Sequence, residues 1–350
     1  MSEGTGSSVL SKCIVIGGAG FIGCNTVHRF MQRGYEVVAV DNLSRTGGDA
    51  NLAWLQSQGP LTFVRADIRD AGAMTRLLDE HGDADTVLHL AGQVAVTTSV
   101  RNPREDFEIN ALGTLNILEA IRLSGRRPLL MYASTNKVYG GMDDVAIEKQ
   151  ASRYAYRDYP LGIAETAPLD FHSPYGCSKG AADQYIHDYH RIYGLPTVVF
   201  RQSCIYGYRQ FGVEDQGWVA WFVIAALLGR DITICGDGKQ VRDVLFIDDL
   251  TELYAAAAQQ PGKVAGKVFN IGGGPAFTMS VWAEFGPLLE EQIGKRIPVT
   301  YADWRPGDQP VYISDIRKIT AELGWKPATS VREGVAKLVE WVRVNKGLFE

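Results

Sequence analysis

The 350-residue sequence predicts an α/β fold built on an open, doubly wound parallel sheet. Two observations predict it: short runs rich in Val, Ile and Leu alternate with longer stretches of helical periodicity, and the runs are apolar along nearly their whole length. Strands buried on both faces have this composition, because helices cover both sides of a parallel sheet. Right-handed crossovers then complete the doubly wound arrangement.

Six strands and four helices are expected in roughly the first 200 residues. Each strand is a short run rich in β-branched and other apolar residues: 12–17, 35–41, 61–66, 86–91, 129–134 and 197–202. Each helix is a stretch in which apolar residues recur every three or four positions: 21–33, 71–81, 106–124 and 179–193. The two patterns alternate along the chain, as βα units require.

After residue 206 the alternation becomes irregular. Helices are expected at 218–228, 281–292 and 331–344, and a further strand at 267–272. We interpret residues 1–205 as the sheet domain, with segments near 240–275 returning to it, and 206–350 as mainly a smaller α/β substrate lobe. The segment 140–174 is too long for a bare connection, so it is either functional or carries structure of its own.

Composition excludes several classes of protein. Hydrophobic residues make up 46% of the chain and charged residues 21%, unlike a disordered or collagen-like protein. No apolar run reaches membrane-spanning length, and the first twelve residues have no targeting pattern. The net charge of -5 is spread without a basic block, which disfavours a nucleic-acid partner. Five cysteines form no CxxC pair, which favours a reduced, cytoplasmic protein.

A glycine-rich turn follows the first expected strand. Gly17, Gly20 and Gly23 stand where a positive φ and close access to a pyrophosphate exclude a Cβ atom. Asp41 ends the second strand, where a carboxylate can hold the adenosine ribose hydroxyls. This order predicts a Rossmann domain that binds a dinucleotide, against the alternative of an ordinary tight turn. A carboxylate at 41 repels a 2′-phosphate, so NAD is favoured over NADP, although Arg45 lies close in sequence.

Tyr175 and Lys179 are four residues apart, just after Pro174, which fits a helix start. This spacing places both side chains on one helical face. The Lys ammonium, together with the positive charge of an oxidised nicotinamide, lowers the pKa of a Tyr toward neutrality. Tyr175 can then act as a general base. With 15 Tyr in the chain, a chance match on an ordinary helix is the alternative.

The segment STNKVYG (134–140) follows the fifth expected strand, at the edge where ligands bind in open α/β sheets. The hydroxyl of Thr135 can hydrogen-bond the substrate hydroxyl that Tyr175 deprotonates. The alternative is a strand-end turn that uses small polar residues.

In this order, the glycine turn, the strand-end Asp, the strand-end Ser-Thr and YxxxK resemble the extended short-chain dehydrogenase/reductase family of nucleotide-sugar enzymes. The resemblance covers nearly the whole chain and implies that NAD stays bound and is used catalytically. It implies cofactor contacts from the turn, the strand ends and the helix, namely Gly17, Gly20, Phe21, Ile22, Gly23, Asp41, Asn42, Ser44, Arg45, Asp67, Ile68, Leu90, Ala91, Gln93, Asn110, Tyr175, Lys179 and Gln202.

Within this family, four segments indicate which members the chain resembles most: 134–140, the stretch up to SPYGCSK at 173–179, RQSCIYGYRQFG at 201–212 and DQGWVAWF at 215–222. They resemble members that invert C2 of a CDP-hexose through a 2-keto intermediate. Dehydratases of the family carry Asp-Glu directly after the strand-end Thr, whereas Asn136 and Lys137 stand here, so elimination is disfavoured. C4 epimerisation of a UDP- or other NDP-hexose stays open, as do decarboxylase or reductase chemistry and a non-catalytic dinucleotide-binding protein.

An acidic chain must supply positive charge where it binds the diphosphate of a nucleotide sugar. Arg209, Arg242 and Arg305 are the candidates, since a guanidinium matches phosphate oxygens. Arg242 and Arg305 also match family positions, and Asp308 is expected to hold the nucleotide ribose.

The sugar itself is expected to contact Thr135, Asn136 and Lys137. We interpret His89 as a strand residue, because no His or Cys stands at metal-ligand spacing from it, and no metal is expected. Family members pair through two helices, here 106–124 and 179–193, which implies a homodimer or homotetramer.

Overall fold

The computed structural model describes residues 11–214, 216–305 and 308–350. The first ten residues, for which the sequence predicts no targeting pattern, lie outside these ranges. So do Asp215 of the DQGWVAWF segment and residues 306–307 between Arg305 and Asp308. Within the described ranges, no helix is both long and apolar enough to cross a membrane.

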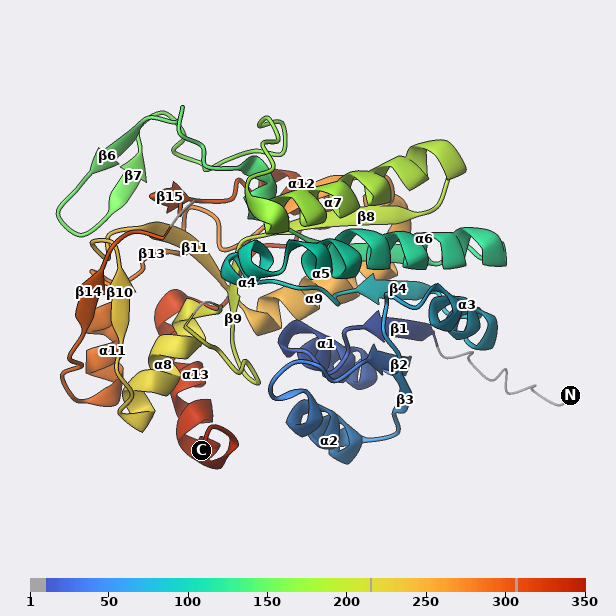
Figure 1. Ribbon diagram of the computed structural model, residues 1–350, viewed down its shortest axis with the longest axis horizontal. Coiled ribbons are helices and arrows are strands. Elements are labelled where there is room, and N and C mark those ends of the chain that lie inside the picture. The colour runs from blue at the N-terminus through green and yellow to red at the C-terminus, as the bar shows by residue number, and fades with distance from the viewer. Residues whose placement is uncertain (1–10, 215, 306–307) are drawn as a thin grey trace, which may run out of the picture.

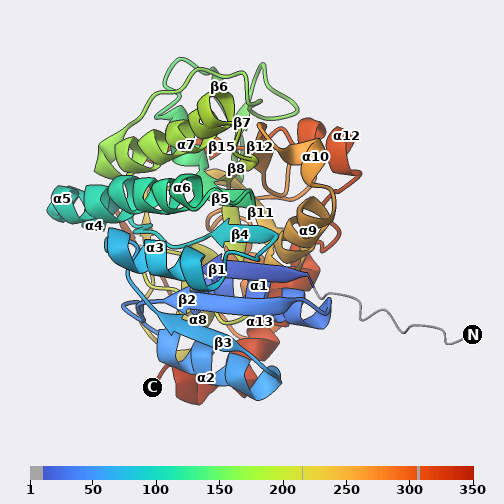
Figure 2. The same cartoon turned by 90° about the vertical axis from the view of Figure 1, so that its right-hand side faces the viewer.

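Seven parallel strands form the central sheet, in the order β12-β8-β5-β4-β1-β2-β3 (Figures 1 and 2). Its strands are β1 (Lys12–Ile16), β2 (Glu36–Asp41), β3 (Thr62–Arg65), β4 (Thr86–His89), β5 (Leu129–Thr135), β8 (Thr197–Gln202) and β12 (Val268–Ile271). Each lies within two residues of an expected strand. The predicted doubly wound α/β sheet is therefore confirmed.

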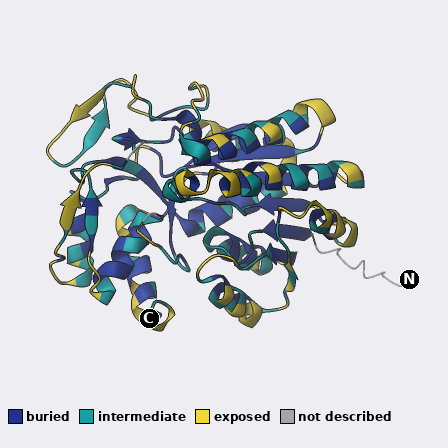
Figure 3. Ribbon diagram, in the orientation of Figure 1, coloured by how far each residue is buried: buried dark blue, intermediate teal, exposed yellow. Residues whose placement is uncertain are grey.

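Helices cover both faces of this sheet (Figure 2). One face packs against α1 (Phe21–Gln32), α2 (Gly48–Gln58) and α9 (Ile247–Gln259), and the other against α3 (Ala71–Glu80), α6 (Gly113–Ser124) and α7 (Ser173–Tyr193). Alternate side chains of β1 enter the two layers: Cys13 and Val15 the first, Ile14 and Ile16 the second. The strands are buried throughout the middle of the molecule (Figure 3), which explains their continuous apolar runs.

The helix expected at 106–124 is interrupted. After α4 (Val96–Arg101), the chain forms α5 (Pro103–Phe107), a π-helical turn (Glu108–Leu112) and then α6. A π turn inserts one extra residue into a helix and often marks a functional site. The helix expected at 179–193 begins earlier, at Ser173, with Pro174 in its first turn. Helices α2 and α9 were not among the expected elements.

The smaller lobe lies beside the sheet (Figure 1). Its helices are α8 (Trp218–Leu228), α11 (Phe285–Ile293) and α13 (Val331–Val344), and α10 (Pro261–Val264) and α12 (Arg317–Leu323) lie near β12. Short strands complete it: β9 (Cys204–Tyr206), β10 (Thr233–Cys235), β11 (Val241–Phe246), β13 (Thr278–Ser280), β14 (Thr300–Ala302) and β15 (Val311–Tyr312). Of the segment 240–275, β12 joins the central sheet and β11 pairs within the lobe. The division at residue 205 stays a prediction.

Helix α11 starts later than the expected residue 281. Glu284 and Ser280 exchange hydrogen bonds, from Glu284 N to Ser280 Oγ at 2.8 Å and from Ser280 N to Glu284 Oε2 at 2.9 Å. These bonds hold residues 281–284 in a turn before the helix.

The segment 140–174 carries structure of its own, an antiparallel hairpin of β6 (Ile147–Lys149) and β7 (Tyr154–Tyr156) (Figure 1). Arg153 donates two hydrogen bonds to the Glu284 carboxylate, at 2.7 and 2.6 Å. The hydroxyl of Tyr156 donates to Val311 O at 2.9 Å. The hairpin is therefore fastened to the smaller lobe.

Candidate active site

The turn between β1 and α1 brings backbone atoms closer than any side chain would allow. Gly17 has φ +87°, and a Cβ on it would lie 2.6 Å from Ala91 N. A Cβ on Gly23 would lie 1.9 Å from Gly17 O. Glycine at these positions thus leaves the N-terminus of α1 open toward the adjoining cavity, where backbone N–H groups can hold a pyrophosphate.

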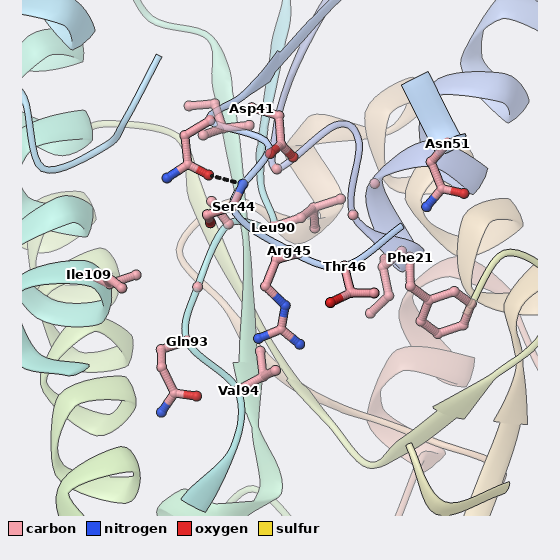
Figure 4. A pocket seen from close by; sticks show the side chains of 18 of the residues that line it. Phe21, Asp41, Ser44, Arg45, Thr46, Asn51, Leu90, Gln93, Val94 and Ile109 are labelled. Carbon is pink, nitrogen blue, oxygen red and sulfur yellow. Dashed lines mark hydrogen bonds between the residues drawn. The ribbon is translucent and has the colours of Figure 1, made fainter. Parts of the chain in front are cut away.

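A cavity of about 390 Å³ lies at this turn (Figure 4). The ends of β1, β2 and β4 line it, together with the described residues Arg209, Gln210, Phe211, Gly212 and Gln216 of the segment 209–216. The predicted cofactor residues that line it are Gly17, Gly20, Phe21, Ile22, Gly23, Asp41, Asn42, Ser44, Arg45, Asp67, Ile68, Leu90, Ala91 and Gln93. The glycine cradle and this lining fit a dinucleotide.

The strand-end carboxylate is held rigidly at the cavity. Asp41 accepts hydrogen bonds from Ala19 N at 3.0 Å and Leu43 N at 2.8 Å. Asn42 Oδ1 accepts from Ser44 N at 3.0 Å, so the loop after β2 is ordered by its own side chains (Figure 4). An anion fixed at this place suits ribose hydroxyls and disfavours a 2′-phosphate.

The segment 209–216 was missed as a wall of the cavity, although Arg209 was expected on the substrate diphosphate. The Arg209 guanidinium lies 4.0 Å from the centre of the Trp54 ring of α2, and Asn51 donates to Arg209 O at 3.4 Å. Arg209 thus lies among the predicted cofactor residues, and its role on the substrate diphosphate stays a prediction. No local pattern reveals it, because Asn51 and Arg209 are 158 residues apart.

Thr135, Tyr175 and Lys179 come together where β5 ends and α7 begins. All three are buried, and the Tyr175 hydroxyl is hydrogen-bonded with Thr135. Lys179 Nζ donates to Ala133 O at 2.6 Å. A Cβ on Gly92, a cavity residue, would lie 3.8 Å from Lys179 Nζ, so the three residues adjoin the dinucleotide cavity without lining it.

Burial has the largest effect on the pKa values of Tyr175 and Lys179. It raises the pKa of Tyr175 to about 12, although the hydrogen bond with Thr135 acts in the opposite direction. Burial also lowers the pKa of Lys179 to about 7, against the attraction of Asp183 and Asp106. The lowering of the Tyr175 pKa predicted for Lys179 together with an oxidised nicotinamide stays a prediction, and it must overcome the effect of burial.

Asn110 and Gln202 are not among the residues that line the cavity. Asn110 accepts from Gln93 N at 2.9 Å and donates to Gln93 O at 3.0 Å, so it holds the backbone of a cavity residue. Gln202 donates to the Tyr254 hydroxyl. The cofactor contacts predicted for both residues stay predictions.

Three of the predicted substrate residues, Lys137, Arg242 and Asp308, form a second cluster. Arg242 and Asp308 form an ion pair at 2.6 Å, largely buried. Burial, followed by the charge of Arg242, lowers the pKa of Lys137 to about 8. Arg305 instead contacts Glu214, with its guanidinium 3.2 Å from the Glu214 carbonyl. Asn136 accepts from the Thr135 hydroxyl at 3.4 Å.

His89 is a buried residue of β4, as interpreted from the sequence. Its Nε2 contacts Thr114 Oγ1 at 2.8 Å, and burial lowers its pKa to about 3. In the described parts of the chain, no three His, Cys, Asp or Glu side chains are grouped to hold a metal ion.

Gly23→Ala is expected to remove bound NAD and lower the melting temperature, because the new Cβ would force Gly17 away from its place. The amount of NAD released on denaturing the purified protein measures the first effect. Gly72→Ala in α3, where a Cβ meets only the flexible ends of Arg76 and Asp70 at 3.3 Å, is the control and should keep its NAD. Full NAD content in both variants would contradict the role of the turn.

Known proteins resemble this chain along nearly all of its length. The CDP-paratose 2-epimerase of Salmonella typhi is 46% identical over 335 residues, which cover 94% of this chain and 98% of that protein. A UDP-glucose 4-epimerase of Thermotoga maritima, solved with UDP-glucose, is 32% identical and has a TM-score of 0.81. The match covers 96% of this chain and 99% of that one.

A dTDP-glucose 4,6-dehydratase of Streptomyces venezuelae, solved with NAD, is 31% identical with a TM-score of 0.82, and the match covers 97% of this chain and 99% of that one. The model of the NAD dependent epimerase/dehydratase family matches residues 13–272. The chain belongs to the NAD-dependent epimerase/dehydratase family, and its cofactor is NAD.

Proposed function

We propose that this protein is a nucleotide-sugar epimerase that inverts C2 of a CDP-hexose of the paratose/tyvelose type through a 2-keto intermediate. The observation that carries the proposal is the meeting of Thr135, Tyr175 and Lys179 beside the dinucleotide cavity, with Asn136 and Lys137 next in the chain. The 46% identity to a CDP-paratose 2-epimerase supports the choice of carbon and nucleotide.

The chain's own residues provide proton transfer and orientation. Tyr175 takes the proton of the reacting hydroxyl and later returns it, while Thr135 holds that hydroxyl by a hydrogen bond. Lys179, four residues after Tyr175 in α7, stabilises the phenolate that forms. Bound NAD supplies the oxidation of the alcohol carbon and its reversal. Inversion requires the keto sugar to present its other face before it is reduced.

The residues after Thr135 argue against elimination of water. That reaction needs an acid and a base near C5 and C6 of the sugar, and Asn136 offers neither. Lys137, with its pKa near 8, is an ammonium or an amine that can donate to a sugar hydroxyl or a ketone. It lies within the influence of the Arg242–Asp308 pair, so this cluster is suited to the diphosphate and its ribose.

The second candidate is inversion at C4 of a UDP-hexose. It is favoured by the fold shared with the UDP-glucose 4-epimerase of Thermotoga maritima. Both reactions use the same three catalytic residues, and the orientation of the sugar alone decides which carbon meets Tyr175.

A substrate deuterated at C2 separates the candidates. We expect a primary isotope effect on turnover, and the label should remain in the epimer with little exchange into solvent, since the hydrogen leaves and returns within the closed site. Product NMR with CDP-, UDP- and GDP-hexoses measures both. The same experiment with C4-deuterated substrate is the control, and an isotope effect there instead would assign the protein as a C4 epimerase.

We also propose a homodimer or homotetramer formed through α6 and α7. Exposed apolar side chains on these helices support it, among them Leu123 at 69% and Ile192 at 65% exposure. All five cysteines are free thiols, in keeping with the predicted cytoplasmic setting.

A further inference from the structure

A buried carboxylate lies behind the catalytic group. Asp106, in α5, is 1% exposed. Its Oδ1 accepts from Gln93 Nε2 at 2.7 Å and from Asn110 Nδ2 at 3.2 Å, and its Oδ2 accepts from Ser178 Oγ. Three donors thus converge on one buried carboxylate.

The partners of Asp106 belong to two different parts of the site. Gln93 lines the dinucleotide cavity, whereas Ser178 stands between Tyr175 and Lys179 in α7. Asn110, in the π-helical turn, also donates to Ser178 Oγ at 3.1 Å. The turn therefore brings one hydrogen-bonded network from the cavity wall to the catalytic helix.

The charge of Asp106 also differs from that of its neighbours. The other titratable groups that face Lys179 are Asp183 on α7, Tyr132 on β5 and His89 on β4. Asp183 is neutralised by Arg201 from β8 at 2.9 Å. Within the described residues Asp106 forms no ion pair, and its charge raises the pKa of both Tyr175 and Lys179.

We propose that Asp106 is a positioning residue: its hydrogen bonds to Gln93, Asn110 and Ser178 hold α7 against the cavity wall and place its charge behind Tyr175 and Lys179. This rests on the proposed function in so far as Tyr175 and Lys179 do the chemistry. Asp106 itself is not among the residues that line the dinucleotide cavity.

Asp106→Asn tests the charge alone. The amide oxygen can still accept from Gln93 and Asn110, and the amide nitrogen can donate to Ser178 Oγ, so the network keeps its bonds. Loss of the negative charge lowers the pKa of Tyr175 and that of Lys179. Both limbs of the pH profile of kcat/KM should therefore move to lower pH, by about one unit.

Ser178→Ala is the matched control, because it removes a hydrogen bond and keeps the charge. Its pH profile should stay in place. A direct readout is the NMR titration of [13Cζ]tyrosine in the NAD-bound protein, with Tyr175 assigned by its absence in Tyr175→Phe. It follows the phenol itself, so it does not depend on turnover.

An unshifted Tyr175 titration in Asp106→Asn would overturn the proposal, and so would an equal shift in Ser178→Ala. If Asp106→Asn does not fold, Asp106→Ser provides a smaller neutral side chain for the same titration. Asp106→Glu restores the charge and should return the titration toward that of the wild type. Turnover by Tyr175→Phe would contradict the proposed function. It would not affect the shift of the Tyr175 titration measured in Asp106→Asn.

Discussion

Tyr175→Phe is expected to lower kcat by about 10²- to 10⁴-fold, the usual contribution of a positioned general base. The hydroxyl that bonds Thr135 is removed, while the buried ring and the start of α7 are kept. NAD content should therefore match that of the wild type, since Tyr175 lies outside the lining of the dinucleotide cavity. Product NMR and NAD released on denaturation measure the two quantities.

The matched control is Tyr185→Phe, a residue of the same helix whose side chain is 48% exposed. It should show wild-type kcat and NAD content. Wild-type turnover by Tyr175→Phe would remove this residue from the mechanism, and loss of NAD would show that it acts through cofactor binding.

Asp183→Asn is expected to lower the free energy of unfolding by about 3–5 kcal/mol, the effect of leaving a buried charge without its partner. Asp183 and Arg201 are 0% and 4% exposed in their side chains and share two hydrogen bonds, at 2.9 and 3.0 Å. Asp183 also accepts from Ser134 Oγ at 2.7 Å, beside the catalytic Thr135. Denaturant titration of the NAD-bound protein measures the loss.

Asp188→Asn, on the same helix, is the control for this change. Its ion pair with Arg191 has a similar length, 2.6 Å, but both side chains are about half exposed. Exposed pairs contribute at most about 1 kcal/mol. Equal losses in the two variants would mean that burial of the Asp183–Arg201 pair has no special effect on stability.

The strands and most of the catalytic group could be predicted from local patterns. β8 and α8 have the predicted bounds, because a buried strand and a buried helix each leave a continuous apolar run between turn residues. Helix α2 was missed because GDANLAWLQSQ has little helical alternation of apolar and polar residues. The π turn at Glu108–Leu112 depends on side-chain packing that periodicity does not express.

The site residues that were missed depend on distant contacts. Asp106 was missed, although it stands four residues before the predicted Asn110 on the inward face of the helical stretch, a spacing that can indicate a buried polar pair. The cavity wall at 209–216 has no such signal. Desolvation of Tyr175 and Lys179, which raises the pKa of the first and lowers that of the second, also depends on the packing around them and could not be predicted from their spacing.

The wall at 209–216 bears on how quickly NAD can be exchanged. Arg45 and Gln216, which are 171 residues apart, are joined by a hydrogen bond beside the cavity, and Phe211 packs against Gly47. We expect a dinucleotide bound in this cavity to leave faster when these contacts are removed, because a lining segment that must move before release adds to the residence time. An epimerase consumes no net oxidant, so slow exchange does not limit it. The same contacts would lower the turnover rate of a dehydrogenase, which must release reduced cofactor after every turnover.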